Sequence, residues 1–216
     1  SAQSYNSLWK QVQTDAENDL PQSAIKRIQR IYNKALDEKN EAQMLRSMLM
    51  LRTYGYEISP DTAQVYTNRI EALLKTETRP VMQALLHAAL AQCYAKRNFS
   101  DDNLTANEKR QKADAHFKAS ITQPEVLANC QTDTYKPLFT LGAASAYFHN
   151  DLLQILLDSY INQGNLTPRE KTDLLQRMAD FYKQRKQYDA AAWLALRAVE
   201  AQYGASFRIK GRIEDH

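Results

Sequence analysis

Glycine and proline are scarce in this chain, with 5 and 6 residues in 216. Folds built from many short strands need these residues at their turns, so their scarcity argues against an all-β protein. The residues that dominate instead are Ala, Leu, Gln, Lys and Glu, which favour helices. The composition therefore predicts an all-α protein that is long enough to bury a sizeable core.

Cysteine is also scarce, since the chain carries only Cys93 and Cys130. Neither has a second Cys or His at the spacing of a zinc site, so no metal centre is predicted. Cys93 shares a helical face with Leu86 and Ala89, which predicts a buried and inert thiol. A Cys93–Cys130 disulfide is compatible with an exported protein, but two cysteines alone do not establish one.

The sequence lacks the motifs of the common enzyme classes. Its histidines are far apart along the chain and form no His-Glu-x-x-His motif; they are His87, His116, His149 and His216. A glycine-rich phosphate loop, a nucleophile elbow and a Cys-x-x-Cys pair are missing as well. We therefore expect a non-enzymatic protein without metal or cofactor, in which His87 is a half-buried structural residue.

Charge of one sign and long apolar runs are likewise missing. The net charge is only +3, and Lys and Arg alternate with Asp and Glu, which is typical of solvated helix faces. No nucleic-acid partner is therefore expected. The longest apolar-rich stretch, Val81–Tyr94, is too short to cross a membrane, so no transmembrane segment is predicted.

Apolar residues recur at intervals of three and four, which is the pattern of amphipathic helices. Buried stripes are predicted at Tyr5, Leu8, Trp9, Val12 and Ala16, at Ala24, Ile28, Ile31 and Ala35, and at Tyr66, Ile70, Leu73 and Leu74. Other helices are expected over Glu41–Tyr54, Pro80–Arg97 and Asp151–Gln163. The predicted fold is an irregular array of antiparallel helical hairpins, a tetratricopeptide-like α-α superhelix, in one domain over residues 1–204.

Several helix ends carry recognisable capping signals. Ser59 followed by Pro60 predicts a helix start, and Thr167–Glu170 has the spacing of a capping box. Gly164 is expected to stop the helix before it. Thr122 is a candidate cap for another short helix.

The remaining segments are less regular. Residues 98–112 are nearly all polar and are predicted to form a long exposed loop that leads into a helix. The segment Tyr135–His149 has no clear period, so its structure stays open. Residues 205–216 are interpreted as a tail or as a linker to a further region.

The last predicted hairpin spans Thr167–Gly204. Its second helix is expected to use one face that carries Tyr188, Ala192, Ala195, Val199 and Tyr203. The tryptophans Trp9 and Trp193 lie on or near apolar faces, so both are assigned to the core. Tyr54, Tyr56 and Tyr160 fall at helix ends, where exposed aromatic rings can serve as an interaction surface.

The string LWKQV, followed by DLPQSAIKRIQRIYNKALDEKNEAQMLRSMLM, resembles a known family. It is similar to the N-terminal helical region of the large alpha-2-macroglobulin-like envelope proteins of Bacteroidetes. The matching positions are Trp9, Lys10, Val12, Leu20, Pro21, Ser23, Ala24, Ile31, Tyr32, Lys34 and Ala35. A second string, YFHNDLLQILL from Tyr147 to Leu157, is similar to another segment of that family.

This resemblance implies an exported protein at the periplasm or the outer-membrane surface. It also implies a longer parent chain with β-sandwich modules, some of which carry a Cys-x-Glu-Gln thioester. Neither Cys93 nor Cys130 is followed by that pattern, so protease trapping does not transfer to these residues.

Two functions follow as alternatives. The first is a helical protein-interaction module that contacts envelope components or the parent's own β domains. The second is a free-standing tetratricopeptide-like protein that binds a peptide or a glycan at the cell envelope.

Overall fold

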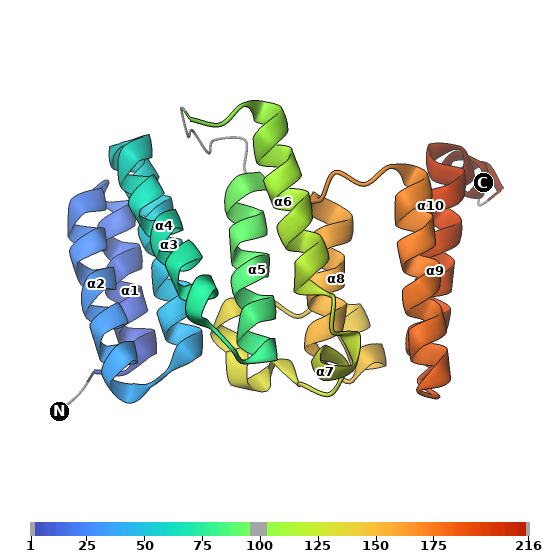
Figure 1. Cartoon of the computed structure of the whole chain (residues 1–216), viewed down its shortest axis with the longest axis horizontal. Helices are drawn as coiled ribbons and strands as arrows, with labels where there is room; N and C mark the ends of the chain where they lie inside the picture. Colours follow the sequence, from blue (N-terminus) through green and yellow to red (C-terminus); the bar gives the residue numbers. More distant parts are fainter. Residues whose placement is uncertain (1–2, 96–102, 215–216) are drawn as a thin grey trace.

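The structure is a computed structural model that describes the backbone of residues 3–95 and 103–214 and the side chains of residues 3–95 and 103–204. Within these ranges the chain forms ten α-helices, two 3-10 helices and no strand. Successive helices pack as antiparallel hairpins that stand side by side (Figure 1). This confirms the predicted all-α class and the irregular hairpin array.

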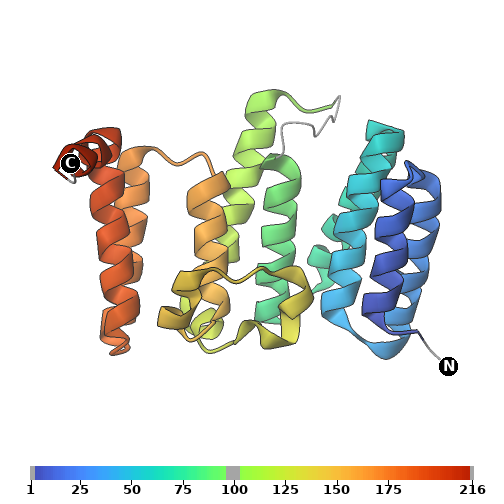
Figure 2. The ribbon, with the colours of Figure 1, turned by 180° about the vertical axis from the view of Figure 1, so that it is seen from behind.

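The N-terminal half contains α1 (Tyr5–Glu17), α2 (Pro21–Glu38), α3 (Glu41–Ile58), α4 (Pro60–Thr76) and α5 (Pro80–Ala95). The C-terminal half contains α6 (Ala106–Ser120), α7 (Pro124–Ala128), η1 (Thr132–Leu138), η2 (Ala143–Phe148), α8 (Leu152–Gln163), α9 (Pro168–Gln184) and α10 (Tyr188–Glu214). The α2, α4, α6 and α9 helices form the layer nearer the viewer in Figure 1. The other layer, seen from behind in Figure 2, consists of α1, α3, α5, α8 and α10.

Two apolar clusters hold the layers together. The smaller one has members on each of the helices α1, α2, α3 and α4. It contains Trp9, Ile28 and Ile31, which the helical periodicity predicted to be buried. The larger one runs from α3 to α10. Arg52 is buried where α3, α4 and α5 meet, and its guanidinium donates to Thr67 Oγ1 at 3.2 Å and to the Cys93 carbonyl at 3.1 Å. Its charge is therefore tied to polar groups of two neighbouring helices, as a buried cation requires.

Between α7 and α8 the chain makes an excursion over residues 131–151, which we call the strap. Its two ends meet in an antiparallel bridge between Gln131 and Asp151. The Thr132 amide donates to the Asn150 carbonyl at 2.9 Å, and the Leu152 amide donates to the Cys130 carbonyl at 2.9 Å. The body of the strap contains η1 and η2 and lies across the lower part of the α5–α8 face (Figure 2). The segment Tyr135–His149, whose structure the sequence left open, lies within the strap.

The predicted polar loop is shorter than expected. Residues 98–102 lie outside the described residues, but residues 106–112 are the first turns of α6. Thr105 caps this helix, and a capping box joins it to Glu108. A strong local start signal therefore outweighs the lack of apolar residues in the first two turns.

The C-terminal segment, which the sequence analysis interprets as a tail or a linker, has regular backbone structure in its described part. The backbone is helical as far as Glu214, after a break at Gly204, whose φ is +58° and ψ is −140°. Glycine adopts this conformation without the steric cost that a side chain would add.

The predicted face of α10 is wrong. The residues that pack inward are Ala190, Ala191, Leu194 and Ala198, whereas Tyr188, Val199 and Tyr203 are exposed. Small side chains let α10 approach α9 closely, and the larger residues are left on the opposite side. Trp193 is half-buried against the larger cluster.

Most of the predicted helix ends are confirmed. Ser59 caps α4, Asp151 caps α8, Gly164 ends α8, and Thr167 forms a capping box with Glu170. Thr122 does not cap α7, whose N-cap is Gln123 without a side-chain hydrogen bond.

Loss of the Thr167 cap is expected to cost about 1 kcal/mol of unfolding free energy, because the Glu170 amide loses its acceptor. Chemical denaturation of Thr167→Ala measures this effect. Thr14→Ala is the matched control, since Thr14 is exposed inside α1 and alanine is the better helix former there. An equal loss of stability in both variants would contradict the capping interpretation.

Candidate functional site

The three tyrosines proposed as an interaction surface do not come together. Tyr54 and Tyr56 are half-buried on α3, and Tyr54 packs against the smaller apolar cluster. Tyr160 belongs to the larger cluster, is 7% exposed, and stacks on Phe117 with ring centres 5.5 Å apart. Tyr160 lies in the last turn of α8, as expected, and borders a pocket with residues of α6 and α9, but most of its ring is buried.

Two histidines that are far apart in the sequence meet between α5 and α6. The Nδ1 atoms of His87 and His116 are 2.9 Å apart, which is a hydrogen bond that requires one ring to donate and the other to accept. Glu71 of α4 lies 3.9 Å from Nε2 of His116 and accepts a hydrogen bond from the Tyr94 hydroxyl at 2.7 Å. The Tyr94 ring stacks on the His116 ring.

Burial lowers the pKa of both His87 and His116, and the nearby charge of Glu71 opposes this shift. Lys112 and the neighbouring imidazole lower the pKa of His116 further. The pair is therefore neutral near pH 7, and a second proton would place two positive rings in contact.

We expect this pair to make the fold less stable in acid. The pKa values of the two histidines are lower in the folded protein than in the unfolded chain. Their contribution to the free energy of unfolding is therefore fully present above the unfolded histidine pKa of about 6.5 and is lost as the pH falls below it. Denaturant unfolding between pH 7.5 and 5 measures the loss. His116→Gln should flatten this dependence, whereas His149→Gln, at an exposed position, should not. If the unfolding free energy depended equally on pH in both variants, the acid sensitivity would not come from the His87–His116 pair.

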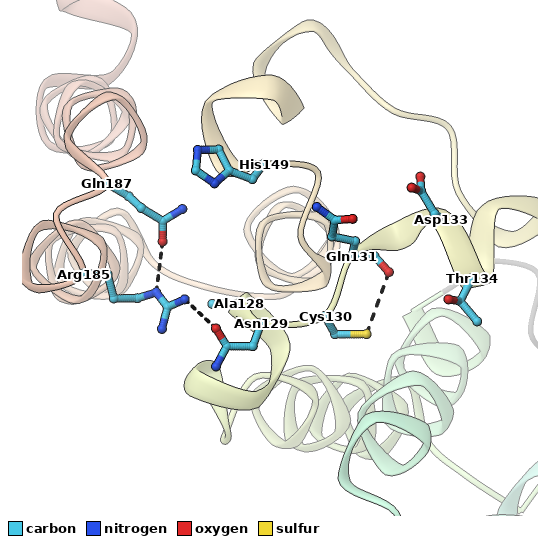
Figure 3. A pocket seen from close by; sticks show the side chains of 9 residues that line it. All are labelled: Ala128, Asn129, Cys130, Gln131, Asp133, Thr134, His149, Arg185 and Gln187. Carbon is cyan, nitrogen blue, oxygen red and sulfur yellow. Dashed lines mark hydrogen bonds between the residues drawn. The ribbon is translucent and has the colours of Figure 1, made fainter.

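A polar pocket of about 640 Å³ lies where the strap leaves α7 and the chain turns from α9 into α10 (Figure 3). Arg185 borders it, but its guanidinium donates to Glu125, Asn129 and Gln187. Burial raises the pKa of the Cys130 thiol, which is the reverse of what an activated nucleophile needs. The pocket therefore presents hydrogen-bonding groups without an activated nucleophile among them.

The structure contains no disulfide between Cys93 and Cys130, so the bridge that the sequence left open is not formed. Cys93 is 1% exposed, in agreement with the buried thiol that was predicted.

Asp151 links α8 and α9 at the point where the two ends of the strap meet. It is 1% exposed, accepts the Gln154 amide at 2.8 Å, and accepts the Tyr182 hydroxyl at 2.7 Å. Burial raises its pKa to about 6, although both hydrogen bonds act in the opposite direction. This carboxyl group is a structural link between the strap and the terminal hairpin.

The outer side of α10 carries an apolar stripe at one end of the array. Its members are Tyr188, Leu196, Val199 and Tyr203, which are 63%, 48%, 39% and 59% exposed. Spacings of eight, three and four residues place them on one side of the helix. Terminal helices of such arrays usually present a polar outer face, so an exposed apolar stripe at this position is unusual.

A groove follows the strap on the layer that contains α3, α5 and α8. It has an apolar inner hollow of about 100 Å³ between these helices and the strap residues Leu138 and Phe139. A wider mouth of about 590 Å³ shares Gln92, Ile155 and Ser159 with the hollow and extends to Trp193. No sequence pattern predicted this groove, because its walls come from segments that are far apart along the chain.

Within the described ranges, no group of three or more His, Cys, Asp and Glu side chains is arranged to hold a metal ion. In the same part of the chain, every helix falls short of the length or the hydropathy needed to span a bilayer. Comparison of the chain with protein-family models, with curated proteins and with solved structures finds no match.

Proposed function

We propose that this chain is a non-catalytic helical module that binds a partner protein through the outer stripe of α10. The partner class is a β-sandwich module of a large alpha-2-macroglobulin-like envelope protein, and the chain is the N-terminal helical region of such a protein. The cellular location in this proposal is the periplasm or the outer-membrane surface, as the sequence resemblance implies.

The observation that carries the proposal is the exposure of Leu196 and Val199 beside Tyr188 at the end of the array. Burying one such aliphatic side chain in an interface contributes about 1.5–3 kcal/mol. Tyrosine adds contact area while its hydroxyl stays hydrated, which suits the edge of a protein interface. Arg197 and Glu200 form an ion pair on the same helix at 3.1 Å and supply a polar margin.

The proposal is tested with a photo-crosslinking amino acid at position 196, using the chain in a solubilised Bacteroidetes envelope extract. The matched control carries it at Leu36, which is 44% exposed on α2. We expect position 196, and not position 36, to link to a protein that contains β-sandwich domains.

A second variant separates binding from folding. Leu196→Lys should change the unfolding free energy by about 0.5 kcal/mol or less, because the residue is exposed. It should nevertheless abolish the crosslink made from a probe at Tyr188. Identical crosslinks from positions 196 and 36, or an unchanged crosslink in Leu196→Lys, would overturn the proposal.

A further inference from the structure

The groove beside the strap has two parts with different chemistry. The inner hollow is walled by Leu85 and Ala89 of α5, Ile155 of α8 and Phe139 of the strap. Its volume of about 100 Å³ is somewhat smaller than an engineered cavity that accepts benzene, so it fits an aliphatic side chain of about Val or Leu size. An apolar hollow of this size selects one side chain and excludes a large aromatic ring.

The mouth of the groove is rich in amides. Gln92 of α5 and Asn162 and Gln163 of α8 line it, and Gln92 donates to Ser159 at 3.2 Å. Asn162 and Gln163 are exposed. Carboxamides both donate and accept hydrogen bonds, as peptide groups do, so they can pair with an extended backbone. Among the described residues that line the mouth, Asp158 alone is charged, and the nearby Arg197 offsets its charge, which favours an uncharged occupant.

One wall of the mouth is irregular backbone. Residues 139–142 lie between η1 and η2 and have neither helical nor strand structure, and residues 140–142 are exposed. Backbone outside helices can offer N–H and C=O groups to an extended chain. The Phe139 amide already donates to the Lys136 carbonyl, and the Gly142 carbonyl accepts from the Ser145 amide, so Thr140 and Leu141 are the residues that can contribute here.

From this arrangement we infer that the groove binds an extended, uncharged peptide segment that inserts one Val- or Leu-sized side chain into the hollow beside Phe139. This site is formed by α3, α5, α8 and the strap, and its mouth ends at Trp193 of α10. The four residues of the α10 stripe are not among its lining residues, so it is a different surface and extends the proposed function to a second ligand.

A sugar fits the same groove less well. Saccharides bind by stacking on open aromatic faces, and Trp193 is the indole that borders the mouth. The guanidinium of Arg197 lies 4.3 Å from the centre of the Trp193 ring, and the Tyr147 ring packs at 5.7 Å. Trp193 is therefore engaged by its own neighbours, whereas the amides face the mouth.

The test uses the whole chain and a panel of capped seven-residue peptides, Thr-Ser-Asn-X-Asn-Ser-Thr, in which X is Ala, Val, Leu, Trp or Lys. Binding is followed by the NMR signals of the two indole N–H groups. Trp193 borders the groove, while Trp9 is buried in the N-terminal cluster and serves as an internal control. We expect the Leu peptide to shift only the Trp193 signal and to bind about tenfold tighter than the Ala and Trp peptides.

Two variants change the hollow in opposite directions. Ala89→Leu fills it and should abolish the preference for Leu over Ala, provided that its unfolding midpoint shows a folded protein. Phe139→Ala enlarges it, and since Phe139 is only partly buried the fold should persist. This variant should move the preference from Leu towards Trp.

Several results would overturn the inference. They are affinities that do not depend on X, tighter binding of the Lys peptide, no response of Trp193, or a response of Trp193 to maltohexaose instead. Crosslinking from position 196 is read separately, so the α10 interface and this groove can each fail without the other.

Discussion

Replacing Phe148 by alanine is expected to lower the free energy of unfolding by about 4 kcal/mol, the typical cost of removing a fully buried aromatic ring. Phe148 ends η2, is 0% exposed, and packs edge-on against Tyr182 with ring centres 5.0 Å apart. Its loss leaves a cavity where the strap, α8 and α9 meet. Equilibrium unfolding in urea measures the change.

Two substitutions serve as controls for Phe148→Ala. Phe148→Leu keeps most of the buried volume and should cost about 1.5 kcal/mol or less. Tyr147→Ala removes the ring of the preceding residue, which is 46% exposed, and should also cost less than Phe148→Ala. If Tyr147→Ala were the more damaging of the two, the assignment of Phe148 as the anchor of the strap would be wrong.

The second large effect is expected at Asp151. Asp151→Ala removes the N-cap of α8, worth about 1 kcal/mol, and leaves the buried Tyr182 hydroxyl without its acceptor, which costs about 1–3 kcal/mol. We therefore expect a loss of about 3 kcal/mol at pH 5. Denaturation of both proteins at several pH values measures it.

The pH dependence of the Asp151 effect has a defined sign. The pKa of Asp151 in the folded protein is about 6, above its ordinary value of 3.8. The contribution of Asp151 to the free energy of unfolding is therefore fully present below pH 3.8 and decreases as the pH rises through 6. The difference between wild type and Asp151→Ala should therefore narrow from pH 5 to pH 8. Asp151→Asn, which keeps a carbonyl acceptor and carries no charge, should lose this pH dependence and most of the stability penalty. If the difference in unfolding free energy between wild type and Asp151→Ala grew above pH 6, Asp151 would not be the buried group with the raised pKa.

Local patterns predicted most of the helices because each pattern has a local cause. Ile28 and Ile31 recur on one helical face, and both are fully buried. The box at Thr167 and Glu170 starts α9 as predicted. The same signal is present at Thr105 and Glu108, but the many polar residues that follow it concealed the start of α6.

The surfaces that we propose for binding were less predictable, since their parts depend on contacts between distant segments. In α10 both sides are apolar, and only the packing against α9 decides that Leu194 is buried and Val199 is exposed. His87 and His116 meet because of the register between α5 and α6. Phe139 reaches the groove because the strap crosses α5 and α8, which no periodicity within the strap indicates.

The two ends of the strap lie next to each other, so this segment leaves the helical array and returns to it at the same place. The hydrogen bonds between Thr132 and Asn150 and between Cys130 and Leu152 return the chain to the point where it left. A change in the length of the strap between these residues therefore need not move α7 relative to α8, and the entropic cost of a longer closed loop grows only slowly. Residues 139–142 are thus a suitable point for inserting new sequence, which would change the wall of the groove while the helical pairs keep their packing.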